Sequence, residues 1–538
     1  MPTSDDRSAE VLAAAAAWLD DDPDPETQRE LRALIDGDHA ELAHRFAGRL
    51  QFGTAGLRGA VAAGPMGMNR VTVQRATAGF ARYLLDTVDD AAARGVVIGH
   101  DARRNSDVFA LDTARVLAGM GIRALLLPPL SPTPVTAFAV TLLGAAGGVM
   151  VTASHNPPAD NGYKVYLATG AQITPPHDEE IAARIDAVTR VRDLVLADPD
   201  DPRIERLGEE PRNAYLAHAT TARFVPELTD VVVAYTPMHG VGGETLLAAF
   251  AAAGFAPPFV VTEQFAPDGT FPTVAFPNPE EPGAMDLLVA RATTVGADIA
   301  LANDPDADRL GVAIPLGDGS WRALRGDEIG WLLADHVLSH TAGDDRLVVT
   351  TLVSSSLLAD LADAHGVHSA EVATGFKWIA RAALDRPELR LVFGYEQALG
   401  YLVGNRPLDK DGISAALTMA EVAALAKRDG VSLQDRLDAL ADRFGRHVTA
   451  ERSIRLTPAE ATVAMAALRA DPPASLGGLT VLEVTDIPIA GIVRIVLSGG
   501  TRVQVRPSGT EPKVKLYGEA VGSDPGPLLD ELAARLMR

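Results

Sequence analysis

The sequence predicts an α/β protein of several domains, and three observations carry this prediction. Short apolar runs alternate along the chain with longer helical patterns, and each run ends in Gly, Asp, Ser or Pro, as buried parallel strands do. A chain of 538 residues, 47% of them hydrophobic, is too long for one core and should divide into roughly three to four domains. The last part alternates apolar with polar residues over 501–506 and 513–517, which is typical of antiparallel strands with one solvated face. The runs expected to be parallel strands are 96–99, 148–151, 231–235, 299–302, 347–350 and 391–394.

The chain begins with a predicted helix over 9–19, which the Asp-Pro pairs at residues 22–25 end, and a helical stretch then runs to about Arg45. Strands and helices alternate from there on, and we place domain boundaries near residues 205, 325 and 445. The predicted parts are an N-terminal helical extension (1–45), three α/β domains (46–205, 206–325 and 326–445) and a C-terminal domain (446–538).

Composition excludes several classes of function. The net charge of -23 argues against nucleic acid or an anionic membrane as a partner, because both need a basic face. No apolar run approaches the roughly 20 residues of a membrane span, so we expect a soluble protein. The absence of cysteine excludes disulfides and thiolate chemistry and fits a cytoplasmic location.

The most informative motif is Thr152-Ala153-Ser154-His155-Asn156, which follows the run 148–151 directly. A serine hydroxyl is a weak nucleophile unless a base or a metal activates it, and His155 is adjacent in sequence. A second turn, Asn161-Gly162-Tyr163-Lys164, would let Lys164 return toward the serine. The alternative is an Asn-Pro turn with solvated polar residues.

A second acidic turn, Asp304-Pro305-Asp306-Ala307-Asp308-Arg309, follows the run 299–302. Its alternating carboxylates can face one hard cation, which prefers oxygen ligands. A helix cap is one alternative. A calcium loop of EF-hand type fails because the sixth position is Arg309, where glycine is required. A haloacid-dehalogenase-type aspartyl nucleophile normally has Thr or Val where this chain has Asp308, so we interpret the three aspartates as ligands.

Two further segments have the composition of binding loops. The segment from Arg506 to Lys513 offers a guanidinium, two hydroxyls, a glycine and an ammonium, which suits a phosphate, although such stretches are often polar hairpin turns. Just past the run 391–394, Glu396 and Gln397 suit vicinal sugar hydroxyls, or form an ordinary surface turn. Since ligands of open α/β sheets bind beyond the carboxyl ends of the strands, we expect these motifs to form one site.

The ordered motifs, from Gly53-Thr54-Ala55-Gly56-Leu57-Arg58-Gly59 to Tyr517, resemble the α-D-phosphohexomutases, which include phosphoglucomutases and phosphomannomutases. The resemblance implies four domains around a central cleft, three similar α/β/α domains and a smaller α+β C-terminal domain. It also implies a phosphoserine enzyme that forms a sugar bisphosphate, with Mg²⁺ as cofactor and a sugar 1,6-bisphosphate as activator.

Residue by residue, the resemblance implies the following roles. Ser154 carries the phosphoryl group, and Mg²⁺ binds to Asp304, Asp306 and Asp308 and to the group on Ser154. His155, Lys164 and Arg58 serve proton transfer and the phosphoserine. The substrate-binding residues implied by the family pattern are Arg309, Thr374, Glu396, Gln397, Lys410, Arg506, Ser508, Gly509, Thr510 and Lys513.

One departure limits the substrate prediction. The common hexomutase loop has Glu-x-Ser, but Ala398 follows Glu396 and Gln397 here, as in the longer branch that includes phosphopentomutases. We predict a hexose mutase for glucose or mannose phosphate, with a phosphopentomutase acting on ribose or deoxyribose phosphate as the alternative. A serine-dependent sugar phosphatase and a non-catalytic sugar-phosphate binder also stay open. The partner is a small sugar phosphate, and the protein is expected to be a monomer or homodimer.

Overall fold

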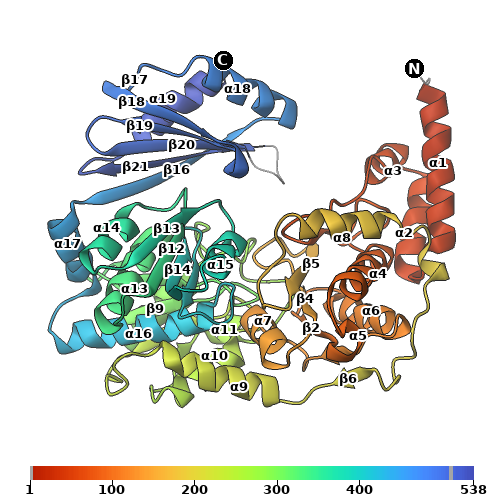
Figure 1. The fold of residues 1–538 in the computed structure, drawn as a ribbon, viewed down its shortest axis with the longest axis horizontal. Coiled ribbons are helices and arrows are strands. Elements are labelled where there is room, and N and C mark those ends of the chain that lie inside the picture. Colours follow the sequence, from red (N-terminus) through yellow and green to blue (C-terminus); the bar gives the residue numbers. More distant parts are fainter. Residues whose placement is uncertain (1–3, 508–512, 538) are drawn as a thin grey trace. The chain divides into compact units, whose positions relative to one another are not determined.

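The computed structural model describes residues 4–507 and 513–537, and their strands form four sheets (Figure 1). The chain divides into two compact units, Met1–Leu324 with Gly400–Ala424, and Arg325–Leu399 with Leu425–Arg538. The predicted α/β architecture is confirmed, while the predicted boundaries near residues 205, 325 and 445 stay predictions.

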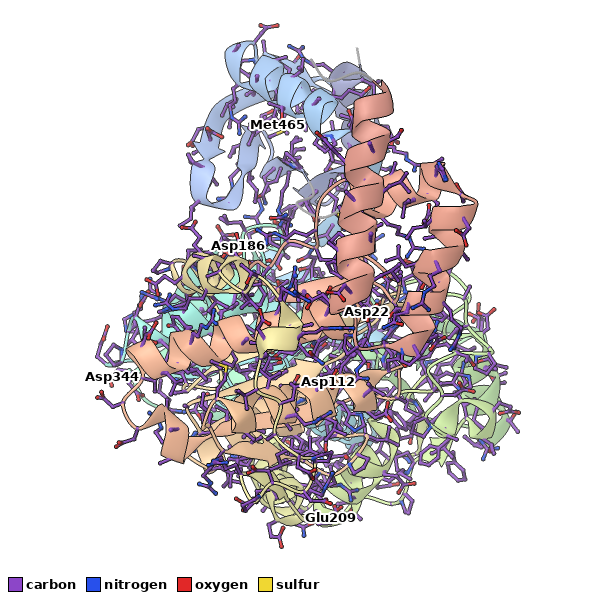
Figure 2. The ribbon with its side chains drawn as sticks, turned by 90° about the vertical axis from the view of Figure 1, so that its right-hand side faces the viewer. Asp22, Asp112, Asp186, Glu209, Asp344 and Met465 are labelled. Carbon is purple, nitrogen blue, oxygen red and sulfur yellow. The ribbon has the colours of Figure 1, made fainter. Side chains whose placement is uncertain are left out.

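Three helices form the N-terminal extension, and a polar turn separates each from the next. Asp22, labelled in Figure 2, accepts a hydrogen bond from Thr27 Oγ1 at 2.6 Å in the turn after the first helix. The stretch predicted to be helical to about Arg45 consists of two helices that divide at Gly37, because Asp38 begins a new helix by accepting the Glu41 amide at 3.0 Å. The helices are α1 (Ser4–Asp21), α2 (Pro25–Asp36) and α3 (His39–Arg45).

The first sheet has six strands in the order β1-β5-β4-β2-β3-β6. The predicted strands β2 and β4 pair in parallel, and β3, which was not predicted, also pairs in parallel with β2. Its two faces are both buried: Val96 and Ile98 pack with Phe80 and Phe109, whereas Val97 packs with the helix that follows β3. The elements are β1 (Leu57–Ala60), α4 (Arg70–Thr87), α5 (Ala91–Arg94), β2 (Val96–His100), α6 (Ser106–Gly119), β3 (Ala124–Leu126), α7 (Thr133–Leu142), β4 (Gly147–Val151), β5 (Asp160–Leu167), α8 (His177–Asp186), η1 (Val191–Asp193) and β6 (Ile204–Arg206).

The prediction of a turn at residues 161–164 was wrong, because these residues lie inside β5. This strand runs antiparallel to β4, and Lys164 lies opposite Met150 in the register. Its side chains are buried, Tyr163 and Tyr166 completely, so strand pairing and burial outweigh the turn preference of Asn161 and Gly162.

The second sheet has the order β11-β10-β9-β7-β8 and carries the acidic turn just after β9. β7 pairs in parallel with β8 and β9, and β10 returns antiparallel to β9. The elements are α9 (Glu210–Ala219), η2 (Thr220–Ala222), β7 (Val233–Thr236), α10 (Gly243–Ala252), β8 (Phe259–Val260), α11 (Thr262–Phe265), α12 (Asp286–Val295), β9 (Ile299–Ala302), β10 (Gly311–Pro315) and β11 (Trp321–Ala323).

A later segment also belongs to the first unit, and a buried ion pair holds it there. It contains β15 (Gly400–Val403) and most of α16 (Gly412–Arg428). Arg223 Nε lies 3.1 Å from Glu421 Oε2, with both side chains at most 2% exposed. The segment therefore brings Lys410 into the same unit as the acidic turn.

In the second unit, β12 pairs in parallel with β13 and β14, and the last sheet is antiparallel in the order β16-β21-β20-β19-β18-β17. The helices α18 and α19 pack on this last sheet, with Met465 of α18 (Figure 2) and Leu529 of α19 in its core. The elements are α13 (Gly326–His340), β12 (Arg346–Thr351), α14 (Leu357–Ala364), β13 (His368–Val372), α15 (Phe376–Leu384), β14 (Arg390–Glu396), α17 (Leu433–Phe444), β16 (His447–Arg455), α18 (Pro458–Ala470), β17 (Ser475–Leu476), β18 (Leu479–Ile487), η3 (Pro488–Ala490), β19 (Ile492–Leu497), β20 (Thr501–Pro507), β21 (Lys513–Val521) and α19 (Gly526–Leu536).

Candidate functional site

Ser154 lies in a tight turn three residues after β4 ends, and its backbone is held in a left-handed conformation. Its φ of 51° is rare for a residue with a side chain, and its side chain is buried at 2% exposure. The Ser154 amide donates to Thr152 Oγ1 at 2.9 Å, and Thr152 Oγ1 donates to Asp101 Oδ2 at 2.6 Å. The turn is thus fixed by hydrogen bonds on the chain that leads into it.

The three aspartates after β9 form one buried cluster. One oxygen of each carboxylate, from Asp304, Asp306 and Asp308, lies within 4.8 Å of the others, and all three side chains are completely buried. The Oδ1 atoms of Asp306 and Asp308 are buried without a hydrogen-bond partner. Buried carboxylate oxygens need such a partner, and a Mg²⁺ ion, which prefers oxygen ligands and is smaller than water, fits this donor set. The cluster could therefore hold a hard divalent cation.

The structure brings Ser154, His155 and Lys164 to this cluster. Ser154 Oγ donates to Asp304 Oδ2 at 2.7 Å, across 150 positions of sequence, and lies 3.2 Å from His155 Nδ1. Lys164 Nζ donates to Asp306 Oδ2 at 2.6 Å and to Asp308 Oδ2 at 2.8 Å. A hydroxyl, an imidazole, an ammonium and three carboxylates thus converge at the carboxyl ends of β4 and β9.

The burial of these charges shifts their protonation. Burial raises the pKa of Asp304 well above its ordinary value, and the charges of Asp306 and Asp308 raise it further. Burial acts on the pKa of Asp306 in the same direction, but the adjacent Lys164 ammonium lowers it below its ordinary value. Burial, then the charges of Arg309 and of Arg58, hold the pKa of His155 well below its ordinary value, so the imidazole is neutral at pH 7.

Three more predicted basic residues lie in the same unit. Arg58 donates to Asn156 Oδ1 at 3.1 Å, so it contacts the turn that carries Ser154. The Arg309 amide donates to Asp304 Oδ1 at 3.0 Å. Lys410 Nζ lies 3.2 Å from Asp308 Oδ2, so the segment before α16 supplies a second ammonium to the carboxylates.

The predicted sugar-binding residues of the second unit also lie on neighbouring loops. The Gly375 amide, next to Thr374, donates to Glu396 Oε1 at 2.8 Å, which joins the loop before α15 to the end of β14. Thr374 Oγ1 is buried without a hydrogen-bond partner. Ser354 Oγ donates to Gln397 Oε1 at 3.1 Å and accepts from the Gln397 amide at 3.1 Å.

The predicted phosphate loop lies between the last two strands of the C-terminal sheet. Arg506 is near the end of β20 and pairs with Lys515, while Lys513 begins β21. Ser508, Gly509 and Thr510 lie outside the described residues. The positions of Arg506 and Lys513 place two basic residues on the strands that flank this loop.

Several residues that hold the site together were not predicted from the sequence. Asp101 and Arg103 follow β2 and support the Ser154 turn, and Thr133 Oγ1 donates to Asp306 Oδ2 at 2.6 Å. Asp101 and Arg103 come directly after a predicted strand, so the rule applied to the other motifs could have found them. Thr133 begins a helix and has no such signal.

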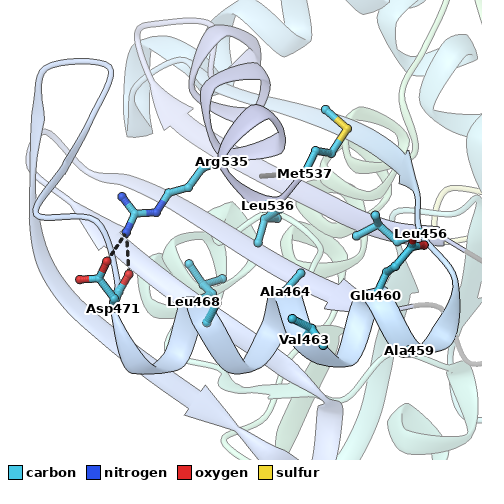
Figure 3. A pocket seen from close by; sticks show the side chains of 11 residues that line it. Leu456, Ala459, Glu460, Val463, Ala464, Leu468, Asp471, Arg535, Leu536 and Met537 are labelled. Carbon is cyan, nitrogen blue, oxygen red and sulfur yellow. Dashed lines mark hydrogen bonds and ion pairs between the residues drawn. The ribbon is translucent and has the colours of Figure 1, made fainter.

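A hollow of about 640 Å³ has none of the predicted site residues in its lining. It is formed by α18 and α19 of the C-terminal domain and is lined mainly by apolar side chains (Figure 3). Arg535 donates to Asp471 Oδ2 at 3.1 Å at one end. The described residues that line the hollow include no side chain with a hydroxyl or an imidazole.

Comparison with known proteins gave consistent matches along the chain. Four domain profiles described as phosphoglucomutase/phosphomannomutase match it: alpha/beta/alpha domains I, II and III over residues 49–192, 213–317 and 325–444, and the C-terminal domain over 451–537. A protein named probable phosphomannomutase from Haemophilus influenzae is 44% identical over 86% of this chain and 94% of its own length.

Other relatives are named phosphoribomutase or phosphopentomutase. A probable phosphoribomutase from Schizosaccharomyces pombe is 37% identical, over 93% of this chain and 92% of its own length. A human phosphopentomutase is 35% identical, over 96% of this chain and 93% of its own length. Among solved structures, a putative phosphomannomutase from Thermus thermophilus superposes with a TM-score of 0.71 at 26% identity and covers 91% of this chain and 100% of its own.

In the part of the chain that the structure describes, no helix is long and apolar enough to cross a membrane.

Proposed function

Because the chain belongs to the phosphoglucomutase/phosphomannomutase family, a family of isomerases, we propose that it interconverts the 1-phosphate and 6-phosphate of a hexose, glucose or mannose, through a phosphoserine at Ser154. The observation that carries the proposal is the hydrogen bond from Ser154 Oγ to Asp304 at 2.7 Å, beside the carboxylates of Asp306 and Asp308. A nucleophilic hydroxyl at a cation-binding cluster suits phosphoryl transfer.

In the proposed reaction, the P–O bond to Ser154 Oγ breaks and a P–O bond to the free hydroxyl of the sugar monophosphate forms. The proton of that sugar hydroxyl passes to a base of the site. The neutral His155 imidazole is our candidate for that base. The Lys164 ammonium, beside the carboxylate partners of Ser154, is our candidate for the acid that gives Ser154 Oγ a proton as its bond to phosphorus breaks. The reverse step returns the other phosphoryl group of the bisphosphate to Ser154, so the net reaction is isomerisation.

Positive charge near the transferring group would stabilise its transition state. Asp304, Asp306 and Asp308 would hold Mg²⁺, with the group on Ser154 as a further ligand, and bound Mg²⁺ would neutralise charge on that group. Arg309 adds a guanidinium directly after Asp308, and Arg58, on β1, adds a second one at the Ser154 turn, where it donates to Asn156.

We assign sugar and phosphate binding to the remaining predicted residues. Glu396 and Gln397 would bind sugar hydroxyls, and Thr374 and Lys410 would support the substrate. This assignment is supported by the hydrogen bond that joins the loop of Thr374 to Glu396. The non-reacting phosphate would bind to the loop formed by Arg506, Ser508, Gly509, Thr510 and Lys513.

The pentose phosphates are the second candidate substrates. The relatives named phosphoribomutase and phosphopentomutase match more than nine tenths of the chain, and Ala398 removes the hydroxyl of the common hexose loop. The same chemistry at Ser154 would serve ribose 1-phosphate, so only the preferred sugar distinguishes this candidate. A sugar 1,6-bisphosphate as activator, a cytoplasmic location and a monomeric or homodimeric state complete the proposal.

A coupled assay tests the reaction. Purified protein receives Mg²⁺, a trace of glucose 1,6-bisphosphate and, in turn, glucose 1-phosphate, mannose 1-phosphate or ribose 1-phosphate, and kcat/KM is compared among the sugars. We expect isomer formation that depends on metal and bisphosphate, and loss of turnover in Ser154→Ala. The control is Ser320→Ala, because Ser320 Oγ likewise donates to an aspartate, Asp318, at 2.6 Å, but in an exposed turn.

Three outcomes would count against the proposal. Appreciable turnover by Ser154→Ala would remove the role of Ser154. Release of inorganic phosphate without an isomer would indicate a phosphatase. A kcat/KM for ribose 1-phosphate far above that of both hexoses would replace the hexose mutase by the phosphopentomutase.

A further inference from the structure

One buried guanidinium holds the turn that carries Ser154. Arg103 Nη2 donates to the carbonyl oxygens of Ser154 and Asn156, both at 2.6 Å. Its Nη1 donates to the carbonyl oxygens of Pro157 at 2.7 Å and Asp160 at 3.0 Å. One side chain therefore spans the whole connection from the nucleophile turn to the start of β5.

Arg103 is itself fixed from two sides. Its side chain is fully buried, and Nε lies 3.4 Å from Asp101 Oδ2. The ring of Phe271, on a loop of the second α/β domain, lies 4.9 Å from its guanidinium carbon. Gly269 permits this approach, because a Cβ there would lie 2.4 Å from the Ala102 carbonyl oxygen and 2.7 Å from Arg103 Cα.

The four hydrogen bonds of Arg103 act where the backbone is strained. A left-handed conformation such as that of Ser154 costs about 1–3 kcal/mol and persists only when its surroundings determine it. Arg103 holds the Ser154 carbonyl, and the planar guanidinium presents fixed donors toward four carbonyl oxygens at once. A lysine has one nitrogen and cannot span carbonyls that two guanidinium nitrogens bind.

We infer that Arg103 is a positioning residue for phosphoryl transfer: it holds the left-handed Ser154 turn so that Oγ stays aimed at Asp304. Arg103 does not touch the reacting atoms; it acts through the backbone of residues 154–160. The inference rests on the proposed role of Ser154 as phosphoryl carrier.

Arg103→Lys tests this inference, and the second unit offers a matched control. Arg346 is also a buried guanidinium that donates to four carbonyl oxygens, those of Gly343, Leu338, Thr341 and His365, and none of these belongs to a predicted site residue. Both Arg346→Lys and Arg103→Lys should lower the melting temperature, because each loses hydrogen bonds to buried carbonyls. Only Arg103→Lys should lower kcat, by about 10- to 100-fold with KM within about twofold, since misplacement of a reacting group costs rate.

Chemical rescue of kcat by added guanidinium distinguishes a positioning role of Arg103 from a general loss of stability. In Arg103→Ala, added guanidinium chloride at millimolar, non-denaturing concentration should restore part of kcat in a saturable way. Activity is expressed per amount of folded protein. If Arg103→Ala does not fold, the comparison of kcat between Arg103→Lys and Arg346→Lys tests the inference by itself. Equal kcat in Arg103→Lys and Arg346→Lys would overturn the inference. If Ser154→Ala stays active, the proposed function fails first; if Ser154→Ala is inactive but Arg103→Lys is not impaired, only the role of Arg103 falls.

Discussion

Replacement of Lys164 by Met would remove the ammonium that two buried carboxylates share. Lys164 Nζ lies 2.6 Å from Asp306 Oδ2 and 2.8 Å from Asp308 Oδ2, and all three side chains are at most 5% exposed. Asp308 keeps the Lys410 ammonium at 3.2 Å, whereas Asp306 keeps the uncharged hydroxyl of Thr133 at 2.6 Å. The variant therefore leaves a buried negative charge poorly compensated.

The cost follows from that burial. Loss of one partner of a buried ion pair destabilises by about 3–5 kcal/mol, against about 0–1 kcal/mol for an exposed pair. At about 2–4 °C per kcal/mol, the first unit should melt about 6–20 °C lower. Since Mg²⁺ bound by the aspartates would replace the missing positive charge, the loss should be smaller in MgCl₂ than in EDTA. If Lys164 also moves a proton in the reaction, kcat should fall by about 10²- to 10⁴-fold.

Melting curves of wild type and Lys164→Met in EDTA and in MgCl₂ give this comparison. Lys515→Met serves as the control, because Lys515 Nζ lies 2.7 Å from Glu451 Oε1 but both side chains are at least 31% exposed. A melting loss for Lys164→Met no larger than that of Lys515→Met would refute the burial argument. An equal loss with and without Mg²⁺ would refute the assignment of the cation to these carboxylates.

Three other substitutions test separate parts of the molecule. Burial alone would raise the pKa of Glu519, but the hydrogen bond with His447 and the charge of Arg502 lower this pKa from 4.5 to about 2. The ionised Glu519 therefore contributes to stability above pH 4.5, and this contribution is lost as the pH falls toward 2. Glu519→Gln should cost about 3 kcal/mol in denaturant unfolding at pH 7 and about 1 kcal/mol at pH 3; a pH-independent cost would contradict this linkage. Arg506→Ala should raise KM for every sugar phosphate alike, as steady-state kinetics can show, and an effect on one sugar only would exclude phosphate anchoring. Gly412→Ala should lower kcat/KM at least about 10-fold, because a Cβ would lie 2.2 Å from the Arg309 carbonyl oxygen, whereas Gly317→Ala, in open space, should have no effect; equal activities would show that the backbone at the start of α16 adapts.

Local patterns in the sequence were enough to predict several strands and the side chains that follow them. The apolar run 299–302 is β9 without change of bounds, and the acidic turn after it forms the predicted carboxylate cluster. Ser154 was predicted from a hydroxyl next to an imidazole after a strand, and the structure places its Oγ at Asp304. Each of these signals lies within about ten residues, the range over which hydrophobic periodicity and turn chemistry act.

Tertiary structure alone decided which distant groups meet. Lys164 reaches Asp306 across 142 positions because residues 161–164 form a strand beside β4, where local preference indicated a turn. Thr133 reaches Asp306 across 173 positions, and Arg103 holds a turn about 50 residues further along the chain. By itself the sequence determined the α/β class and the cluster of carboxylates, and it predicted Ser154 as the nucleophile, because strand ends and side-chain chemistry depend on local residues. The ion pairs of the carboxylates and the hydrogen bonds of Arg103 to the Ser154 turn depend on sheet order and on packing between domains, which no local pattern predicts.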